Sequence, residues 1–147
     1  MSHMKRIMKK HFLNGFDKEK IIKALSSHLI LQHPDITVTY LFGSFITSGS
    51  FADIDVAVIT AAELAKPLEF EIALEKELEG ICKYSIDVRV LNGAPLSFCQ
   101  SVIREGRVIV DREPNVRSDF EGRILKLYFD FARFRRRYLA EVMNAPI

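Results

Sequence analysis

Three aspartates in this chain lie among apolar residues, where a charge is unexpected. Asp53 and Asp55 begin the strand-like run 53–59, and Asp87 lies within the run 84–91. Residues two apart on a strand point to one face, about 7 Å apart, so Asp53 and Asp55 form a pair. Carboxylates there are costly unless they are solvated, paired or bound to a cation, and two together repel each other. A divalent cation would neutralise them, and ligands made of oxygen alone favour Mg²⁺ or Mn²⁺ over zinc.

A third carboxylate and a Gly-Ser pair extend this hypothesis. If the strand that carries Asp87 lies beside the strand that carries Asp55, three carboxylates converge on one face of the sheet. Such a set can hold two metal ions about 3.5–4 Å apart, one activating an attacking hydroxyl and one clamping leaving phosphates. Gly43-Ser44 follows another strand-like run and suits a phosphate, because glycine lets the backbone approach closely while serine and the next N–H groups donate hydrogen bonds.

Each feature also has an ordinary structural explanation. A Gly-Ser pair after a strand is often a turn, an Asp-x-Asp at a strand start is often a cap or a solvated edge, and Asp87 can be an exposed residue on an edge strand. Their order along the chain is much rarer by chance than any one of them. We therefore interpret Gly43, Ser44, Asp53, Asp55 and Asp87 as one metal and phosphate site.

Apolar periodicity predicts the elements that would position this site. Helices are expected at 17–32 with Asp17 as cap, at 66–80 with Gly80 as stop, from Pro95 to about Gly106, and at 118–142, and strands at 36–42, 53–59, 84–91 and 107–110. The segment 43–52 predicts a loop or a short helix. In the helix 66–80 we expect Leu68, Ile72, Leu78 and Ile81 to face inward and the glutamates to face solvent. The order predicts a small α/β (α+β) domain whose mixed sheet is flanked by helices, the last of them long.

Composition limits the remaining possibilities. The 147 residues fit one domain, 1–147, in which residues 1–16 are expected to be mobile and residues 1–4 to be a cloning remnant. A formal net charge of +2 gives little support to nucleic acid as a partner. Cys82 and Cys99 are too few for a disulfide framework, which indicates reduced thiols and a cytoplasmic location. No membrane-spanning run is visible, so we expect no membrane partner.

Residues 41–58, in which Leu-Phe-Gly-Ser precedes Asp-Ile-Asp-Val-Ala-Val, resemble the signature of the DNA polymerase β-like nucleotidyltransferase superfamily. Within it the chain is most similar to minimal nucleotidyltransferase (MNT) domains, many of which are antitoxins of HEPN/MNT toxin–antitoxin pairs. The resemblance continues through residues 86–95, 106–110 and the aromatic, arginine-rich stretch 128–138. It covers residues 17–142.

This resemblance implies a nucleotidyltransferase fold and Mg²⁺-dependent transfer of AMP from ATP, with two Mg²⁺ ions, or Mn²⁺, as cofactor. It implies that Asp53, Asp55 and Asp87 are metal ligands and catalytic residues, Asp87 also being the base for the acceptor hydroxyl, and that Gly43 and Ser44 bind the nucleotide. The implied acceptor is a tyrosine of a partner HEPN toxin, a small all-helical RNase. An oligomer is compatible with this assignment.

One departure from the family pattern concerns the loop between Gly-Ser and Asp-x-Asp. The family usually has about ten residues there with one or more arginines, whereas residues 45–52 number eight and none is basic. Because a cationic clamp on phosphate is often a large catalytic effect, two alternatives stay open. The domain can be a weak or inactive nucleotidyltransferase that neutralises its partner by binding alone, or, less favoured, an adenylyltransferase that acts on a small molecule.

Two other features have competing interpretations. The arginines at 133 and 135–137 indicate either a solvated helix face or a contact with phosphates or an acidic partner, and Ile124, Leu127, Phe131, Phe134 and Tyr138 form an apolar stripe on the same helix. His28 and His33 are expected at the surface, near the end of the first helix.

Overall fold

The computed structural model describes residues 10–144 and contains one mixed four-stranded sheet. In chain order the elements are β1 (His11–Phe12), α2 (Gly15–Gln32), β2 (Ile36–Phe42), α3 (Ser44–Thr47), β3 (Ser50–Phe51), β4 (Ile54–Thr60), α4 (Pro67–Cys82), β5 (Ile86–Val90), α5 (Leu96–Glu105), β6 (Arg107–Asp111) and α6 (Pro114–Asn144). The sheet order is β5-β4-β2-β6, with β4 and β5 parallel and the other pairs antiparallel. The predicted fold class is confirmed.

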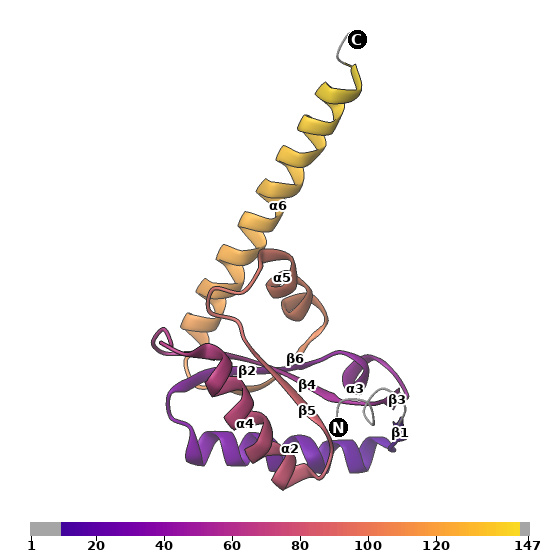
Figure 1. The fold of residues 1–147 in the computed structure, drawn as a ribbon, viewed down its shortest axis with the longest axis vertical. Helices are drawn as coiled ribbons and strands as arrows, with labels where there is room; N and C mark the ends of the chain where they lie inside the picture. Colours follow the sequence, from indigo (N-terminus) through magenta and orange to yellow (C-terminus); the bar gives the residue numbers. More distant parts are fainter. Residues whose placement is uncertain (1–9, 145–147) are drawn as a thin grey trace.

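Two hydrophobic cores lie on opposite faces of this sheet. Helices α2 and α4 cover one face, and α5 with the first half of α6 covers the other, which gives three layers (Figure 1). Side chains of the central strands alternate between the two cores. On β4, Val56 and Val58 face α2 and α4, whereas Ala57 and Ile59 face α5 and α6.

Glutamates of α4 close the outer edge of β5. Three of them, spaced four residues apart, accept hydrogen bonds of 2.8–2.9 Å from alternate backbone N–H groups of the strand: Glu71 from Val90, Glu75 from Val88 and Glu79 from Ile86. An uncovered strand edge invites pairing with another chain, and these bonds occupy that edge. The prediction that the glutamates form a solvated helix face is therefore wrong for these three.

Two helices begin earlier than predicted. Asp17 does not cap α2, because Asn14 Oδ1 accepts the N–H of Asp17 at 2.8 Å and the helix starts at Gly15. α6 begins at Pro114, four residues before the expected Ser118. Proline suits the first turn of a helix because its fixed φ is already helical and its missing N–H has no partner there.

The inner face of α4 differs from the prediction. Leu74 and Leu78 are buried, whereas Leu68 and Ile72 are 67% and 44% exposed and were wrongly expected inside. The helix also continues past Gly80 to Cys82, because the next residue, Lys83, supplies the left-handed conformation (φ 66°) that ends many helices.

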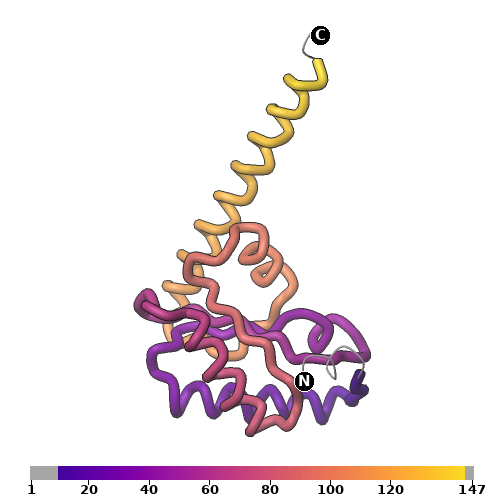
Figure 2. The backbone as a smooth tube through the Cα atoms, viewed as in Figure 1, coloured from indigo at the N-terminus to yellow at the C-terminus, as the bar shows by residue number. Residues whose placement is uncertain are grey.

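α6 is anchored at its base and leaves the body of the protein at its far end (Figures 1 and 2). Phe120 and Ile124 are buried against α5 and the sheet, and Tyr40 Oη donates a 2.7 Å hydrogen bond to Glu121 Oε2. From residue 133 to residue 144 every side chain is exposed. Residues 10–144 therefore leave the second half of the predicted apolar stripe on this helix uncovered.

The segment before α2 is structured where it is described. His11 and Phe12 pair with Phe51 and Ser50 as β1 and β3, and the His11 ring lies 4.8 Å from the ring of Tyr84. Residues 1–9 lie outside the described part, and the mobility expected for residues 1–16 stays a prediction. Both cysteines are free, as predicted, and both are buried. None of the helices formed by residues 10–144 combines the length and apolar character of a membrane span.

Candidate active site

Strand register brings the predicted acids together at one end of the sheet. Asp55 on β4 lies opposite Phe42 of β2 on one side and opposite Asp87 of β5 on the other. β4 begins at Ile54, one residue later than predicted, so Asp53 lies in the bend before the strand and not on it. The adjacency of the Asp55 and Asp87 strands, on which the three-acid hypothesis depends, is confirmed.

Gly43 forms the floor of this site. It follows Phe42, the partner of Asp55, with φ 74° and ψ −161°, a conformation that is essentially restricted to glycine. A Cβ atom at this position would lie 2.1 Å from Asp55 Oδ2, which is a severe clash. Glycine is therefore required twice, for its backbone angles and for the room it leaves to the Asp55 carboxylate. Ser44, the first residue of α3, is half-buried beside it.

The carboxylates interact electrostatically. Burial, together with the charges of Asp87 and Asp53, raises the pKa of Asp55 to about 6, while the nearby Arg89 opposes this shift. Like charges held together in a partly dehydrated place favour protonation of one of them unless a cation compensates. The raised pKa thus indicates that the three acids share one site in space, as their order in the sequence suggested.

Asp53 contributes an oxygen without a protein partner. Its Oδ1 atom is buried and, among the described residues, makes no hydrogen bond. A buried carboxylate oxygen left this way is costly unless a ligand meets it. The Asp53 oxygen and the clustered charges both fit a divalent cation, which carboxylate oxygens bind well.

Arg89 is a site residue that the sequence interpretation missed. Its Nε lies 3.7 Å from Asp87 Oδ1, and its guanidinium lies 5.9 Å from the centre of the Phe98 ring. Asp87 and Arg89 both line an open hollow of about 660 Å³ between α4, β5 and the start of α5. The available signal was spacing, because Arg89 is two residues after Asp87 on the same strand and so shares its face.

Aromatic packing, and not a cationic cradle, fixes the short loop after Gly43. The Phe51 ring lies 4.9 Å from Phe45 and 5.4 Å from Tyr84. From α2, Lys18 Nζ donates hydrogen bonds of 2.8 and 3.0 Å to the carbonyls of Phe45 and Ser48, and it also lies over the Phe45 ring. The loop itself carries no basic residue, and the Lys18 ammonium beside it is engaged in hydrogen bonds to the loop backbone.

Comparison with known proteins agrees with this geometry. Residues 19–115 match the sequence model of the family described as polymerase beta, nucleotidyltransferase. The chain belongs to this nucleotidyltransferase family. Members of the family use divalent metal ions, in keeping with the acids at the end of β4 and β5. None of the curated protein sequences compared with the chain matches it.

Solved structures of MNT antitoxins share the nucleotidyltransferase fold of this chain. A toxin–antitoxin complex, MntA-HepT, is 24% identical with a TM-score of 0.62 over 88% of this chain and 99% of that one. The MNT antitoxin solved with a tri-AMPylated HEPN toxin from Shewanella oneidensis is 25% identical, with a TM-score of 0.61 and coverages of 87% and 97%. A toxin–antitoxin structure with AMP-PNP is also 25% identical, with a TM-score of 0.63 and coverages of 86% and 98%.

Proposed function

We propose that this nucleotidyltransferase transfers AMP from ATP to a hydroxyl group, that of a tyrosine, on a helical HEPN-type toxin and so acts as its antitoxin. The observation that carries the proposal is the convergence of Asp53, Asp55 and Asp87 at one end of the sheet, where Gly43 leaves room for the Asp55 carboxylate. The similar structures support it, since one contains a tri-AMPylated HEPN toxin and another contains AMP-PNP. ATP as substrate and two free thiols support a cytoplasmic setting.

We assign a different chemical role to each group of residues in the site. Asp53, Asp55 and Asp87 would hold two Mg²⁺ ions, or Mn²⁺, which neutralise the triphosphate and make the acceptor hydroxyl more acidic. Gly43 lets the backbone approach the phosphates, and Ser44 donates a hydrogen bond to them. Asp87, at the mouth of the hollow, takes the proton of the acceptor hydroxyl. The hydroxyl oxygen bonds to the α-phosphorus of ATP, and pyrophosphate leaves.

Arg89 supplies positive charge that the neutral loop does not. Its side chain lines the same hollow as Asp87 and is 56% exposed, so it is accessible to an incoming phosphate. Packing against the Phe98 ring limits the positions that it can take. We assign Arg89 to charge stabilisation of the triphosphate or of leaving pyrophosphate.

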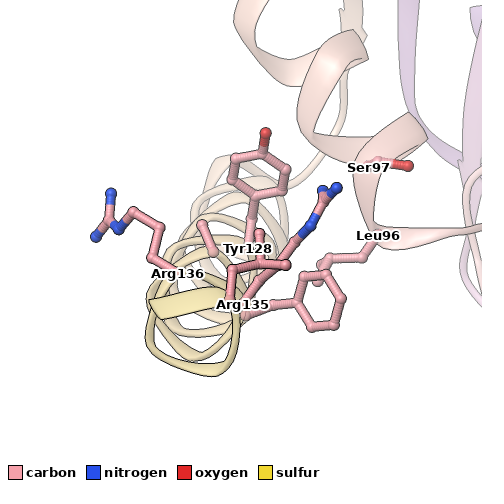
Figure 3. A pocket seen from close by; sticks show the side chains of 8 residues that line it. Leu96, Ser97, Tyr128, Arg135 and Arg136 are labelled. Carbon is pink, nitrogen blue, oxygen red and sulfur yellow. The ribbon is translucent and has the colours of Figure 1, made fainter. Parts of the chain in front are cut away.

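The free end of α6 offers a surface for the toxin. Its apolar residues recur at spacings of three or four residues from the buried Phe120 and Ile124 into the exposed half, where they form what we call the exposed seam: Leu127, Phe131, Phe134, Tyr138 and Val142. Such a seam fits an amphipathic partner helix. Beside it, a groove of about 610 Å³ runs between α6 and the start of α5, with Arg135 turned toward α5 and Arg136 turned away (Figure 3).

Charge selects the kind of partner helix. Residues 131–144 contain four arginines and one glutamate, so a second copy of this chain would bring like charges together. A helix with an apolar stripe and acidic flanks is complementary to the seam. We therefore assign the exposed seam to docking of the toxin rather than to self-association.

A second candidate function is supported by the neutral loop. If residues 45–52, without arginine, hold ATP too weakly for turnover, the domain would neutralise its toxin by binding alone. The two functions differ in their dependence on Asp53.

One experiment separates them. The chain is incubated with its partner toxin, Mg²⁺ and ATP labelled on the α-phosphate, in parallel with the Asp53→Asn variant. We expect label on the toxin with the unmodified chain and none with the variant, while both still form the complex and both keep the same circular dichroism. Neutralisation that persists in Asp53→Asn without any labelling would favour binding alone, and labelling that persists would refute the assigned site.

A further inference from the structure

Two histidines and a glutamate meet on the side of the sheet opposite the acids. His28 lies on α2, His33 is the C-cap of the same helix, and Glu77 lies in the middle of α4. Both histidine Nε2 atoms approach one and the same oxygen, Oε2 of Glu77, with the His33 contact at 2.5 Å. The ligand atoms of the three residues all lie within 4.8 Å of one another.

The end of α2 explains why the two rings meet although they are five residues apart. Five residues along a continuous helix would turn the side chains well away from each other. Pro34 disfavours helical angles for His33, which takes φ −129° and ψ 74°. Its ring therefore turns back toward His28, and the ring centres are 5.9 Å apart.

The position of this turn is fixed by bonds outside the cluster. Arg112 donates hydrogen bonds to the carbonyls of Leu29, Ile30 and His33 at 2.7–3.0 Å, and so holds the end of α2. On α4, Glu77 points toward α2, whereas Glu71, Glu75 and Glu79 point toward β5. The three ligand atoms are thus presented by two helices whose relative position is set elsewhere.

We propose that His28, His33 and Glu77 form a zinc site that links α2 to α4. Two imidazole nitrogens and one carboxylate oxygen are a ligand set that Zn²⁺ takes in proteins, with water in the fourth position. Bonds of about 2.0–2.2 Å in a tetrahedron put the ligand atoms about 3.3 Å apart, so small side-chain movements would close the cluster on the ion. The side chains are 25%, 19% and 40% exposed, which leaves room for entry of the ion and for the water.

This site is separate from the carboxylates assigned to nucleotidyl transfer. Asp55 and Asp87 lie on the face of the sheet that α5 and α6 cover, whereas His28 and Glu77 lie on helices of the other face. The donor sets differ as well, since imidazole favours zinc and carboxylates alone favour magnesium. The inference therefore does not depend on the proposed function.

The test measures metal binding by the full chain after removal of metal. Titration with Co²⁺, a spectroscopic substitute for zinc, is expected to produce the visible absorption of tetrahedral cobalt with one ion per chain, and Zn²⁺ should displace it. His28→Gln and Glu77→Gln should each weaken Zn²⁺ binding about a hundredfold or more, because even loss of an outer partner of a metal ligand costs about 10–100-fold. Zn²⁺ should also raise the thermal midpoint of the unmodified chain but not of these variants.

Two control variants make the result specific. Glu69→Gln removes an exposed glutamate from the same helix, and Asp53→Asn combined with Asp55→Asn removes the acidic site; both should bind Zn²⁺ as the unmodified chain does. Circular dichroism would confirm that the variants fold. Absence of the cobalt spectrum, or Zn²⁺ binding that survives Glu77→Gln or disappears in the double aspartate variant, would overturn the proposal.

Discussion

The acid end of the sheet and the exposed seam of α6 do different jobs by different physical means. At the acid end, strand pairing places Asp55 opposite Asp87, and Gly43 packs against the Asp55 carboxylate. On α6 every side chain from residue 133 to residue 144 is exposed, and large apolar groups such as Phe131 and Phe134 face solvent. Under our proposal, the residues assigned to catalysis lie on paired strands and the surface assigned to partner docking lies on an uncovered helix.

This contrast makes the two regions separable by mutation. Changes at the acid end should impair transfer while the complex still forms. Changes on the seam should impair the complex while the isolated chain keeps its fold. A single variant that abolished both would show that the regions are not independent.

The largest effect is expected at Gly43. Gly43→Ala places a Cβ atom on the Asp55 carboxylate and strains a backbone that glycine alone accepts, so transfer should fall by more than about a hundredfold and stability by about 1–3 kcal/mol. Labelling of the toxin and chemical denaturation measure the two effects. Gly49→Ala is the matched control, because a Cβ there meets nothing within 4 Å, and its stability should change by less than about 0.5 kcal/mol. Equal behaviour of the two variants would contradict the role of Gly43.

The exposed seam is tested by replacing two of its phenylalanines with glutamates. Phe131→Glu combined with Phe134→Glu should weaken toxin binding about a hundredfold, since few central aromatic contacts dominate an interface, while the thermal midpoint of the free chain stays nearly the same. Calorimetry measures the affinity.

Phe129→Glu is the control for the seam, because Phe129 is 60% exposed but lies on the opposite side of the helix. It should bind the toxin normally. If the chain alone is a dimer that the double variant makes monomeric, the seam serves self-association and our assignment is wrong.

A smaller effect is expected at Arg89. Arg89→Gln should slow transfer about tenfold to a hundredfold, mainly through weaker use of ATP, and Arg89→Lys should recover part of the loss because it restores charge without the planar fork. Steady-state rates at varied ATP concentrations measure this. Arg104→Gln, on the exposed end of α5, provides a control without effect. An unchanged rate in Arg89→Gln would contradict the assignment of Arg89 to charge stabilisation of the triphosphate.

The smallest effect comes from pH. The pKa of Asp55 is raised to about 6, so the metal-free chain gains stability from this group below its unfolded pKa of about 4 and loses that gain as the pH rises through 6. A bound cation reverses the preference, because it requires the ionised carboxylate. Mg²⁺ or Mn²⁺ should therefore raise the thermal midpoint more at pH 7.5 than at pH 5. Asp55→Asn should remove this difference, and a difference that persists there would contradict the assignment.

Much of the acid site could be predicted from the sequence, because the apolar pattern of a short run of neighbouring residues already indicates a strand. The near-continuous apolar run in 53–59 and the alternation along 84–91 indicated two strands, and the structure meets the condition that they be adjacent, which makes neighbours of Asp55 and Asp87. The exact start of β4 was not predictable, since the bend at Asp53 depends on how residues 44–51 pack on Lys18 and Tyr84.

Contacts between segments that are far apart in the chain could not be predicted from the sequence. The turn of His33 toward Glu77 and the bonds from Arg112 to the end of α2 join parts of the chain that no periodicity connects. The same holds for the glutamates of α4 on the edge of β5, which helical spacing alone marks as a solvated face.

The central claim is that Asp53, Asp55 and Asp87 together bind the metal that serves nucleotidyl transfer. Anomalous diffraction from crystals of the chain grown with Mn²⁺ and AMP-PNP tests it directly. We predict manganese peaks within bonding distance of these three carboxylates, with the triphosphate over Gly43 and Ser44. Manganese and nucleotide bound elsewhere, with the three carboxylates free, would contradict the account.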